Sequence, residues 1–190
     1  MTPFAALDFE TADDQRDSAC AVGVARVEGG RVVYADAALI RPPRSRVKFT
    51  EIHGLRWEDL RDQPPFVEVW KRFAPLLDGC TRIAAHNAPF DMGVLRASAT
   101  LIQQDLPELQ YACSLAIARK TYNLESYRLN QVAYAVGHEE FDHHDALADS
   151  DACARIIIHA AKRHGADDLA GLLAETKQVL KPLVQPNVGG

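Results

Sequence analysis

The first part of the chain places its apolar residues in short runs that predict β-strands. One run covers residues 4–7, and two further β-type runs follow at 20–27 and 32–40. Residues 29–30 are both glycine, and because glycine accepts positive φ, this pair predicts a tight hairpin between the two later runs. Two prolines at 42–43 end the third run, so we expect three strands that are antiparallel neighbours.

Beyond residue 64 the apolar residues recur at three- and four-residue steps, which is typical of amphipathic helices. Residues 47–55, before this change, are expected to form a loop. Asn87, Ser126 and Asp145 are of residue types that cap helices, so we expect each of them to begin one. The pattern predicts helices at 66–77, 88–104, 114–120, 126–136, 145–164 and 167–180, and strands at 82–85 and 109–113.

These elements together predict an α/β fold of one domain. Three antiparallel strands followed by alternating helices and strands describe a mixed central β-sheet flanked by helices. With 190 residues the chain is long enough to bury about 70% of its unfolded surface around a single core. We expect residues 1–181 to form this domain and residues 182–190 to form a flexible C-terminal tail.

Composition and charge narrow the classes of function. The formal net charge of −5 argues against a broad grip on duplex nucleic acid, but it allows a small footprint on a strand end. Basic residues cluster at 41–48 and 119–128, where they are either solvated or in contact with phosphates. The four cysteines are far apart and form no C-x-x-C pair, as expected for reduced thiols. Because no apolar run approaches the roughly 20 residues needed to cross a bilayer, we expect a cytoplasmic protein without a secretion signal or membrane anchor.

Two acidic residues at the end of the first strand raise the first chemical question. Side chains two positions apart in a strand project to the same side, so the carboxylates of Asp8 and Glu10 can converge. Such a pair repels when buried, and it requires either a compensating cation or a wet strand end. A divalent metal would satisfy this requirement. The alternative is that the strand stops at Asp8 and that Glu10 is solvated in the following loop.

Two further segments carry acids at the ends of expected elements. Asp91 lies in the first turns of a helix that follows a strand, where it either faces a ligand or complements the helix dipole. His144 and Asp149 are separated by roughly 140° around a helix, so they share a site only if His144 precedes the helix. His143 is a rival for the role of base, and Asp145 with Asp149 is a rival acidic pair. The alternative for this segment is a solvated, acid-rich helix start.

The acids of these three segments predict a metal site if they meet in space. Four carboxylates without cations would repel by several kcal/mol, which a marginally stable domain does not tolerate. Hard oxygen ligands select Mg²⁺ or Mn²⁺, and the absence of a Cys/His tetrad argues against zinc. Two such ions about 3.5 to 4 Å apart catalyse phosphodiester cleavage, with a histidine that deprotonates the attacking water. We therefore expect two Mg²⁺ or Mn²⁺ ions as cofactors.

Three motifs carry a resemblance to a known family. D-x-E-T at 8–11, H-N-A-P-F-D at 86–91 and H-x-A-x-x-D at 144–149 resemble the motifs of the DEDDh, DnaQ-like 3′–5′ exonucleases. This family includes the proofreading epsilon subunit of bacterial DNA polymerase III, and the order and spacing match over about residues 4–160. The resemblance implies a ribonuclease H-like fold and hydrolysis of nucleic acid from the 3′ end to nucleoside 5′-monophosphates.

The resemblance also implies roles for individual residues. The two metals would be bound by Asp8, Glu10, Asp91 and Asp149, and the general base would be His144. His53 is included in the substrate site through the segment I-H-G-L, which is a weaker match. The residues expected near the terminal nucleotide are Phe9, Thr11, His53, His86, Asn87 and Phe90.

The leading hypothesis is a metal-dependent 3′–5′ exonuclease that acts on single-stranded nucleic acid, with DNA favoured, or on frayed 3′ ends. Aromatic faces such as those of Phe9 and Phe90 would stack on bases without reading sequence. The expected partners are single-stranded 3′ ends and a DNA polymerase or repair complex. Two alternatives are a noncatalytic domain that docks on a polymerase and a two-metal phosphoesterase that acts on nucleotides. The presence of all four acids together with His144 argues against the noncatalytic alternative.

Overall fold

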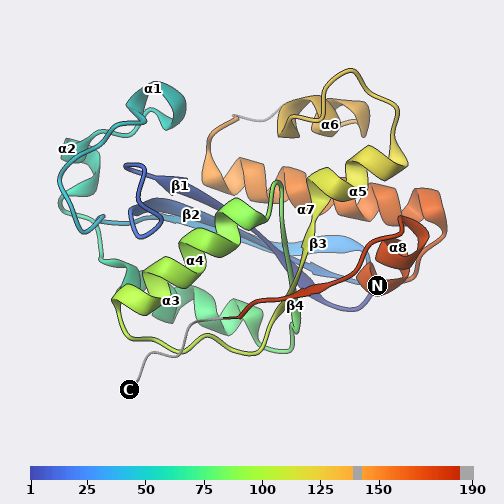
Figure 1. Cartoon of the computed structure of the whole chain (residues 1–190), viewed down its shortest axis with the longest axis horizontal. Helices are drawn as coiled ribbons and strands as arrows, with labels where there is room; N and C mark the ends of the chain where they lie inside the picture. The colour runs from blue at the N-terminus through green and yellow to red at the C-terminus, as the bar shows by residue number, and fades with distance from the viewer. Residues whose placement is uncertain (139–142, 185–190) are drawn as a thin grey trace.

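A mixed β-sheet forms the centre of the molecule. The computed structural model describes residues 1–138 and 143–184, and the strands found there are β1 Phe4–Thr11, β2 Ala19–Glu28, β3 Arg31–Leu39, β4 Arg82–Ala85, β5 Gln110–Cys113 and β6 Lys181–Pro182. Their order in the sheet is β3-β2-β1-β4-β5-β6 (Figure 1). The first three strands are antiparallel neighbours, whereas β4 is parallel to both β1 and β5. The predicted α/β fold with a mixed central sheet is confirmed.

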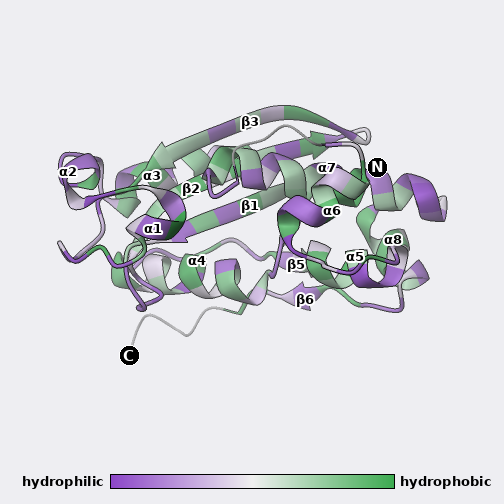
Figure 2. Ribbon diagram, turned by 90° about the horizontal axis from the view of Figure 1, so that it is seen from above, coloured by the Kyte–Doolittle hydropathy of each residue, from purple (hydrophilic) through white to green (hydrophobic). Residues whose placement is uncertain are grey.

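Helices cover both faces of this sheet (Figure 1). They are α1 Thr50–His53, α2 Trp57–Leu60, α3 Phe66–Phe73, the 3₁₀ turn η1 Ala74–Leu77, α4 Pro89–Leu101, α5 Ser114–Thr121, α6 Leu129–Ala135, α7 Ala146–His164 and α8 Leu169–Glu175. Helices α3 and α4 pack on one face, and α5, α7 and α8 pack on the other. The short α2 lies at the periphery and is largely hydrophilic (Figure 2). None of the helices in the described ranges combines enough length and apolar character to span a membrane.

The hairpin between β2 and β3 forms where the two glycines predict it. Gly29 and Gly30 have φ values of +56° and +75°, which L side chains rarely adopt. Glu28 pairs with Arg31 across the turn, so only the two glycines connect the strands. The hairpin prediction is confirmed.

Strand β1 carries different chemistry on its two faces. Leu7 and Phe9 pack with α3 and α4 in one apolar cluster, whereas Phe4 packs with α7 in another. Because side chains alternate along a strand, Asp8 and Glu10 project to the same face as Phe4. The acidic pair therefore points to the side of the sheet that α7 covers.

A glycine on β2 lets α7 approach the sheet beside this acidic pair. Gly23 pairs in register with Asp8, and a Cβ atom on Gly23 would lie 1.8 Å from the carbonyl oxygen of Ala146. Interiors are close-packed, so no side chain fits into that space. The first turn of α7, which carries Asp149, reaches the level of Asp8 because residue 23 has no side chain.

The predicted helix caps are only partly correct. The side chain of Asp145 accepts a hydrogen bond from the backbone N–H of Ala148 at 2.9 Å, so its predicted role as the cap of α7 is confirmed. The same prediction is wrong for Asn87 and Ser126, because α4 and α6 begin without a side-chain cap. Asn87 instead has a φ of +70°, which places it in the turn that joins β4 to α4.

Two segments differ from the sequence predictions. Residues 47–55, expected to be a loop, contain the one-turn helix α1, which ends at Gly54 with a φ of +76°. The last predicted helix, at 167–180, is shorter than expected because Lys177 has a φ of +56° and turns the chain away from the helix axis. In both segments a single residue with left-handed backbone ends the helix, and hydrophobic periodicity does not reveal such a residue.

The start of the expected flexible tail is ordered by contact with the sheet. Pro182 pairs with Gln110 in β6, and the backbone N–H of Leu183 donates to the carbonyl of Leu109 at 2.8 Å. The side chain of Leu183 is only 7% exposed because it packs into the core beneath α4. The prediction of a tail from residue 182 is therefore wrong at its first positions, and residues 185–190 lie outside the described residues.

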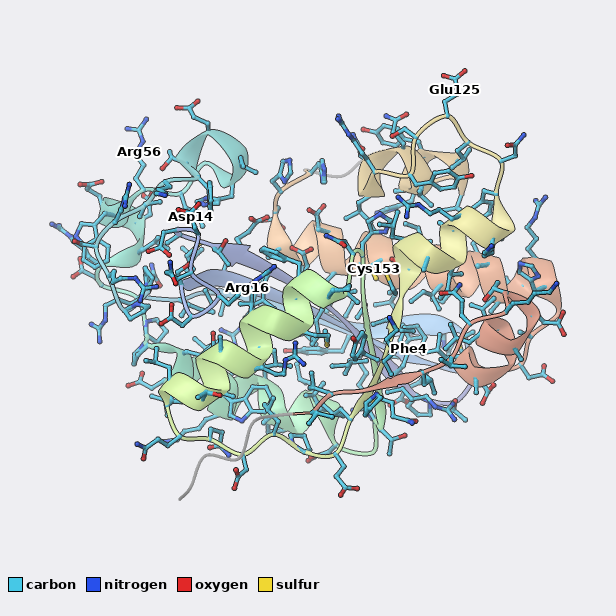
Figure 3. The ribbon with its side chains drawn as sticks, viewed as in Figure 1. Phe4, Asp14, Arg16, Arg56, Glu125 and Cys153 are labelled. Atoms are coloured by element: carbon cyan, nitrogen blue, oxygen red, sulfur yellow. The ribbon has the colours of Figure 1, made fainter. Side chains whose placement is uncertain are left out.

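We expect Gly23→Ala to lower the free energy of unfolding by about 1 to 3 kcal/mol or more, because the added methyl group must displace the backbone at Ala146. Urea denaturation followed by circular dichroism measures this change. The matched control is Gly93→Ala within α4, where the nearest atom to a new Cβ is the flexible Arg16 side chain at 3.5 Å (Arg16 is labelled in Figure 3). The control should be neutral or stabilising by up to about 1 kcal/mol. Equal effects of the two substitutions would contradict the close approach at Gly23.

Candidate active site

One cavity of about 630 Å³ brings the predicted acids together. It lies at the end of β1, between α1 on one side and α6 on the other (Figure 1). Its lining includes all four carboxylates of the three motifs: Asp8, Glu10, Asp91 and Asp149. Segments that are more than 50 residues apart in the chain therefore contribute to one site.

Three of the four acids form a tight group. Asp8, Glu10 and Asp149 each offer a carboxylate oxygen, and these oxygens all lie within 4.8 Å of one another. Asp8 and Glu10 come from the α7 face of β1, and Asp149 comes from the first turn of α7. Asp149 is buried and the other two residues are half-buried, and such a cluster of carboxylate oxygens fits a hard divalent cation such as Mg²⁺ or Mn²⁺.

Asp91 reaches the same cavity from the other side of β1. Its Oδ1 accepts a hydrogen bond from the backbone N–H of Phe9 at 3.0 Å, and its side chain is buried. This amide is available because β4 pairs with β1 only at Ala5 and Ala6. The divergence of β4 from β1 thus leaves a donor that fixes Asp91 next to the acidic pair.

Burial and mutual repulsion make these carboxylates weak acids. Burial, with added repulsion from Asp91 and Asp149, raises the pKa of Asp8 well above its ordinary value. Burial raises the pKa of Glu10 to about 8, with Asp149 contributing repulsion. Burial also raises the pKa of Asp91 to about 8, although the hydrogen bond from Phe9 acts in the opposite direction. The protein therefore needs positive charge here to keep all these groups ionised at neutral pH.

Two stacked histidines lie beside Asp149. The Nδ1 atom of His143 is 3.0 and 3.1 Å from the two carboxylate oxygens of Asp149. His144 contacts the same carboxylate through its backbone N–H, at 3.1 Å, and its ring stacks on that of His143 at 3.9 Å between centroids. His144 has a φ of +74° and precedes α7, as its predicted position before the helix requires. Burial lowers the pKa of His144, with His143 contributing repulsion.

Of the residues predicted to contact substrate, all line the cavity except His53. Phe9, Thr11, Asn87 and Phe90 line the cavity, which is where the prediction places them. His53 does not line it; its Nδ1 accepts a hydrogen bond from the backbone N–H of Leu55 at 3.1 Å, and its ring lines a neighbouring pocket.

His86 lines the cavity, but both of its ring nitrogens are occupied by protein groups. Its Nδ1 is 2.9 Å from the hydroxyl of Ser114, and its Nε2 is 2.9 Å from the carbonyl of Tyr127. Burial lowers the pKa of His86 to about 4, so the ring is neutral at physiological pH. A direct hydrogen bond from His86 to substrate would require one of these contacts to break.

The structure adds lining residues that sequence reasoning did not assign to the site. Phe49, which precedes α1, and Ile52, within α1, line the cavity from one side, and Ile52 is 51% exposed. Arg128 and Asn130 face it from the start of α6. The basic cluster at 119–128 was the available signal for Arg128, whereas Phe49 and Asn130 had no local signal.

The sequence profile of a family described as exonuclease, and named after RNase T, matches residues 5–157 of this chain. The chain belongs to this exonuclease family. Within it the chain is a DnaQ-like member, as the resemblance of its motifs implies.

Two curated relatives of this chain are DNA polymerase III proteins. It is 35% identical over 159 residues to the PolC-type DNA polymerase III of Thermotoga maritima, which covers 82% of this chain and 12% of that protein. It is 30% identical over 113 residues to the epsilon subunit of DNA polymerase III of Escherichia coli, which covers 56% of this chain and 46% of the subunit. The chain therefore spans less than half the length of either relative.

Solved structures share the fold of this chain. Exonuclease X in complex with 5′-overhanging duplex DNA superimposes with a TM-score of 0.71 at 22% identity, covering 91% of this chain and 99% of that one. The nuclease domain of 3′hExo, a DEDDh family member bound to rAMP, gives a TM-score of 0.70 at 12% identity, covering 85% and 92%. The expected ribonuclease H-like fold is confirmed.

We expect the metal-free chain to lose stability as pH rises. An acid whose pKa is raised from about 4 to about 8 on folding is protonated in the folded state and ionised in the unfolded state between those values, so the free energy of unfolding falls across that window. Thermal unfolding in EDTA at about pH 5 and about pH 8 measures this loss.

Asp8→Asn should show a smaller loss of stability than the parent chain between these two pH values, because it removes one of the repelling charges. Adding Mn²⁺ should raise the Tm of the parent chain more at the higher pH. Parallel pH profiles for the parent chain and Asp8→Asn would contradict the electrostatic account.

Proposed function

We propose that this chain is a metal-dependent 3′–5′ exonuclease that releases nucleoside 5′-monophosphates from single-stranded nucleic acid, with DNA favoured, or from frayed 3′ ends. The observation that supports it most is the convergence of Asp8, Glu10 and Asp149 within 4.8 Å, in one cavity with Asp91 and two histidines. The open cavity is large enough for a nucleotide and is lined by Phe49 and Phe90, whose aromatic faces suit bases of any sequence.

The four acids are the proposed ligands of two divalent ions, Mg²⁺ or Mn²⁺. Four carboxylates carry a formal charge of about −4 when ionised, which two divalent cations balance and one does not. When bound, such ions lower the pKa of a bound water and stabilise the charge that develops on the phosphate and the leaving oxygen. The role of the protein is to hold Asp8, Glu10, Asp91 and Asp149 at fixed positions on β1, α4 and α7.

A histidine beside Asp149 is the proposed general base. The motif assigns this role to His144, whose ring lines the cavity. The contact between Nδ1 of His143 and the carboxylate of Asp149, at 3.0 and 3.1 Å, favours His143 as the second candidate, because it holds an imidazole directly beside one of the proposed ligands. Either ring would take the proton of the attacking water.

The proposed partners are single-stranded 3′ ends and a DNA polymerase or repair complex. The named relatives are polymerase III proteins, which supports a polymerase as a partner for this chain. The net charge of −5 supports contact with a strand end rather than with a long duplex.

The second candidate function is a two-metal phosphoesterase acting on nucleotides, in which the same four acids would bind the metals.

The test of the proposal is an end-labelled digestion with Mg²⁺ or Mn²⁺. Single-stranded DNA, single-stranded RNA and a duplex with a mismatched 3′ end, each labelled at the 5′ end, should give ladders that shorten one nucleotide at a time. EDTA should stop the reaction. Internal cleavage, or an activity that EDTA does not affect, would refute the exonuclease proposal. Hydrolysis of free nucleotides without any shortening of polymers would support the phosphoesterase instead.

We expect Asp8→Asn and Asp149→Asn each to lower the rate of digestion by at least about 10³-fold, because each removes a ligand that supports several kcal/mol of transition-state stabilisation. Initial rates of mononucleotide release measure the loss. Circular dichroism should show an intact fold in both variants, because each loses a charge from a repelling cluster. Full activity in either variant would remove that acid from the proposed site.

The two histidines are separated by paired substitutions. His144→Ala should lower kcat by about 10² to 10⁴-fold if His144 is the base, whereas His143→Ala should then have a smaller effect. The pH dependence of kcat should lose its acidic limb only in the variant that lacks the base. The opposite ranking of the two variants would assign the role to His143.

A further inference from the structure

One wall of the active-site cavity is formed by the residues that lead into α6. Arg128, Leu129 and Asn130 line the cavity from this side. Leu129 is buried and packs with the α5 residue Ala118 and the α7 residue Ile156, so the backbone of this wall is anchored to two helices. Among the described residues that line the cavity, Arg128 is the only arginine or lysine.

A directional chain of hydrogen bonds holds the backbone next to Arg128. A carbonyl only accepts, so Nε2 of His86 carries the proton in its 2.9 Å contact with the carbonyl of Tyr127. The neutral ring then accepts at Nδ1 from the hydroxyl of Ser114, at 2.9 Å. The thiol of Cys153 donates in turn to the oxygen of Ser114, at 3.4 Å. His86 therefore links α7 and α5 to the residue that precedes Arg128.

A second anchor acts on the same segment. The hydroxyl of Tyr127 donates to the carbonyl of Tyr122 at 2.9 Å and accepts from the backbone N–H of Leu124 at 3.3 Å. The side chain and the carbonyl of Tyr127 are thus both held by protein groups. The segment presents Arg128 from a fixed backbone rather than from a mobile loop.

Within residues 1–138 and 143–184 the charge of Arg128 takes part in no ion pair. Arg44 pairs with Asp13 and Asp17, and Arg82 pairs with Asp168, whereas the ion pairs of the described residues do not include Arg128. Arg128 lines the same cavity as four carboxylates without pairing with any of them. An arginine placed to neutralise those acids would bond to them, so its charge is available to a ligand in the cavity.

We infer that Arg128 binds a phosphate of the substrate strand other than the one that is cleaved, and that His86 is a positioning residue for Arg128. The inference rests on the proposed function, because it requires a substrate with more than one phosphate in the cavity. The acids and their ions take the scissile phosphate, and the guanidinium takes a neighbouring phosphate through paired N–H donors. This contact should raise the affinity for longer strands relative to dinucleotides. It also provides local positive charge for the substrate in a chain whose net charge is negative.

The first experiment compares Arg128→Ala with the parent chain on two substrates of different phosphate number. On a single-stranded pentanucleotide the KM should rise about tenfold with little change in kcat, because one charged phosphate contact is lost. On a dinucleoside monophosphate, whose one phosphate is the scissile one, KM should change by less than about twofold. The slope of log kcat/KM against log salt on the pentanucleotide should become shallower by about 0.7.

Lys120→Ala is the matched control, because Lys120 is an exposed cation on the neighbouring α5 that does not line the cavity. It should match the parent chain on both substrates. Arg128→Lys should recover part of the affinity for the pentanucleotide but not all of it, since lysine lacks the paired donors. Equal effects of Arg128→Ala and Lys120→Ala would overturn the inference, and so would equal KM changes on both substrates.

The positioning role of His86 has its own readout. His86→Ala should raise KM on the pentanucleotide in the same way as Arg128→Ala, and the double variant should be no worse than Arg128→Ala alone. His86→Gln places an amide N–H near the position of Nε2, so it should restore much of the lost affinity. Additive effects in the double variant, or no rescue by glutamine, would overturn the role of His86.

The outcomes separate this inference from the function on which it rests. If the parent chain digests neither substrate with Mg²⁺ or Mn²⁺, the proposed function fails and the inference fails with it. If the parent chain digests the pentanucleotide and Arg128→Ala does so with an unchanged KM, the proposed function stands and the inference alone fails. Thermal unfolding of each variant shows whether a rate change reflects a lost contact or a lost fold.

Discussion

Repulsion between buried carboxylates is the constraint on which the rest of this structure depends. Asp8, Glu10 and Asp149 are brought within 4.8 Å of one another by strand pairing, helix packing and hydrogen bonds. Strand β1 is paired on both sides, α7 packs over Gly23, and Asp91 is fixed by a backbone amide of β1. The apolar core therefore works against the electrostatics of the site, and a divalent cation bound by the proposed ligands would relieve that repulsion.

In the proposed function, chemistry and recognition come from different parts of the fold. The acids lie on the central strand and on the two helices that pack against it, where close packing keeps their positions within narrow limits. The groups that face a ligand from the sides lie in peripheral segments: α1 with Ile52, and the start of α6 with Arg128. Such segments vary without disturbing the core, so specificity for a particular strand can change while the acids stay in place.

The sequence alone predicts the parts of this architecture that follow from short-range rules. The two-residue period of a strand places Asp8 and Glu10 together, and the glycine pair predicts the hairpin. Which histidine ring contacts Asp149 depends on the positive φ of His144, which no periodicity reveals. The engagement of His86 depends on a partner far away in the chain, whereas His53 bonds to the nearby backbone of Leu55 and lines a neighbouring pocket. The sequence alone does not show why residue 23 is glycine, because an isolated glycine in a strand has several explanations. The reason is the close approach of the α7 backbone, which only the folded structure shows.

The contact at Gly23 also limits how this scaffold can change. At the level of the acids the backbone of β2 at Gly23 packs directly against the backbone of α7 at Ala146. No side chain lies between them, so no side-chain rearrangement can change the spacing between β1 and Asp149. A library of variants could reshape the rims of the cavity freely, but any residue larger than glycine at this point would move Asp149 relative to the acids of β1. The distance between the two halves of the proposed metal site is thus set by backbone-to-backbone packing, which only glycine permits here.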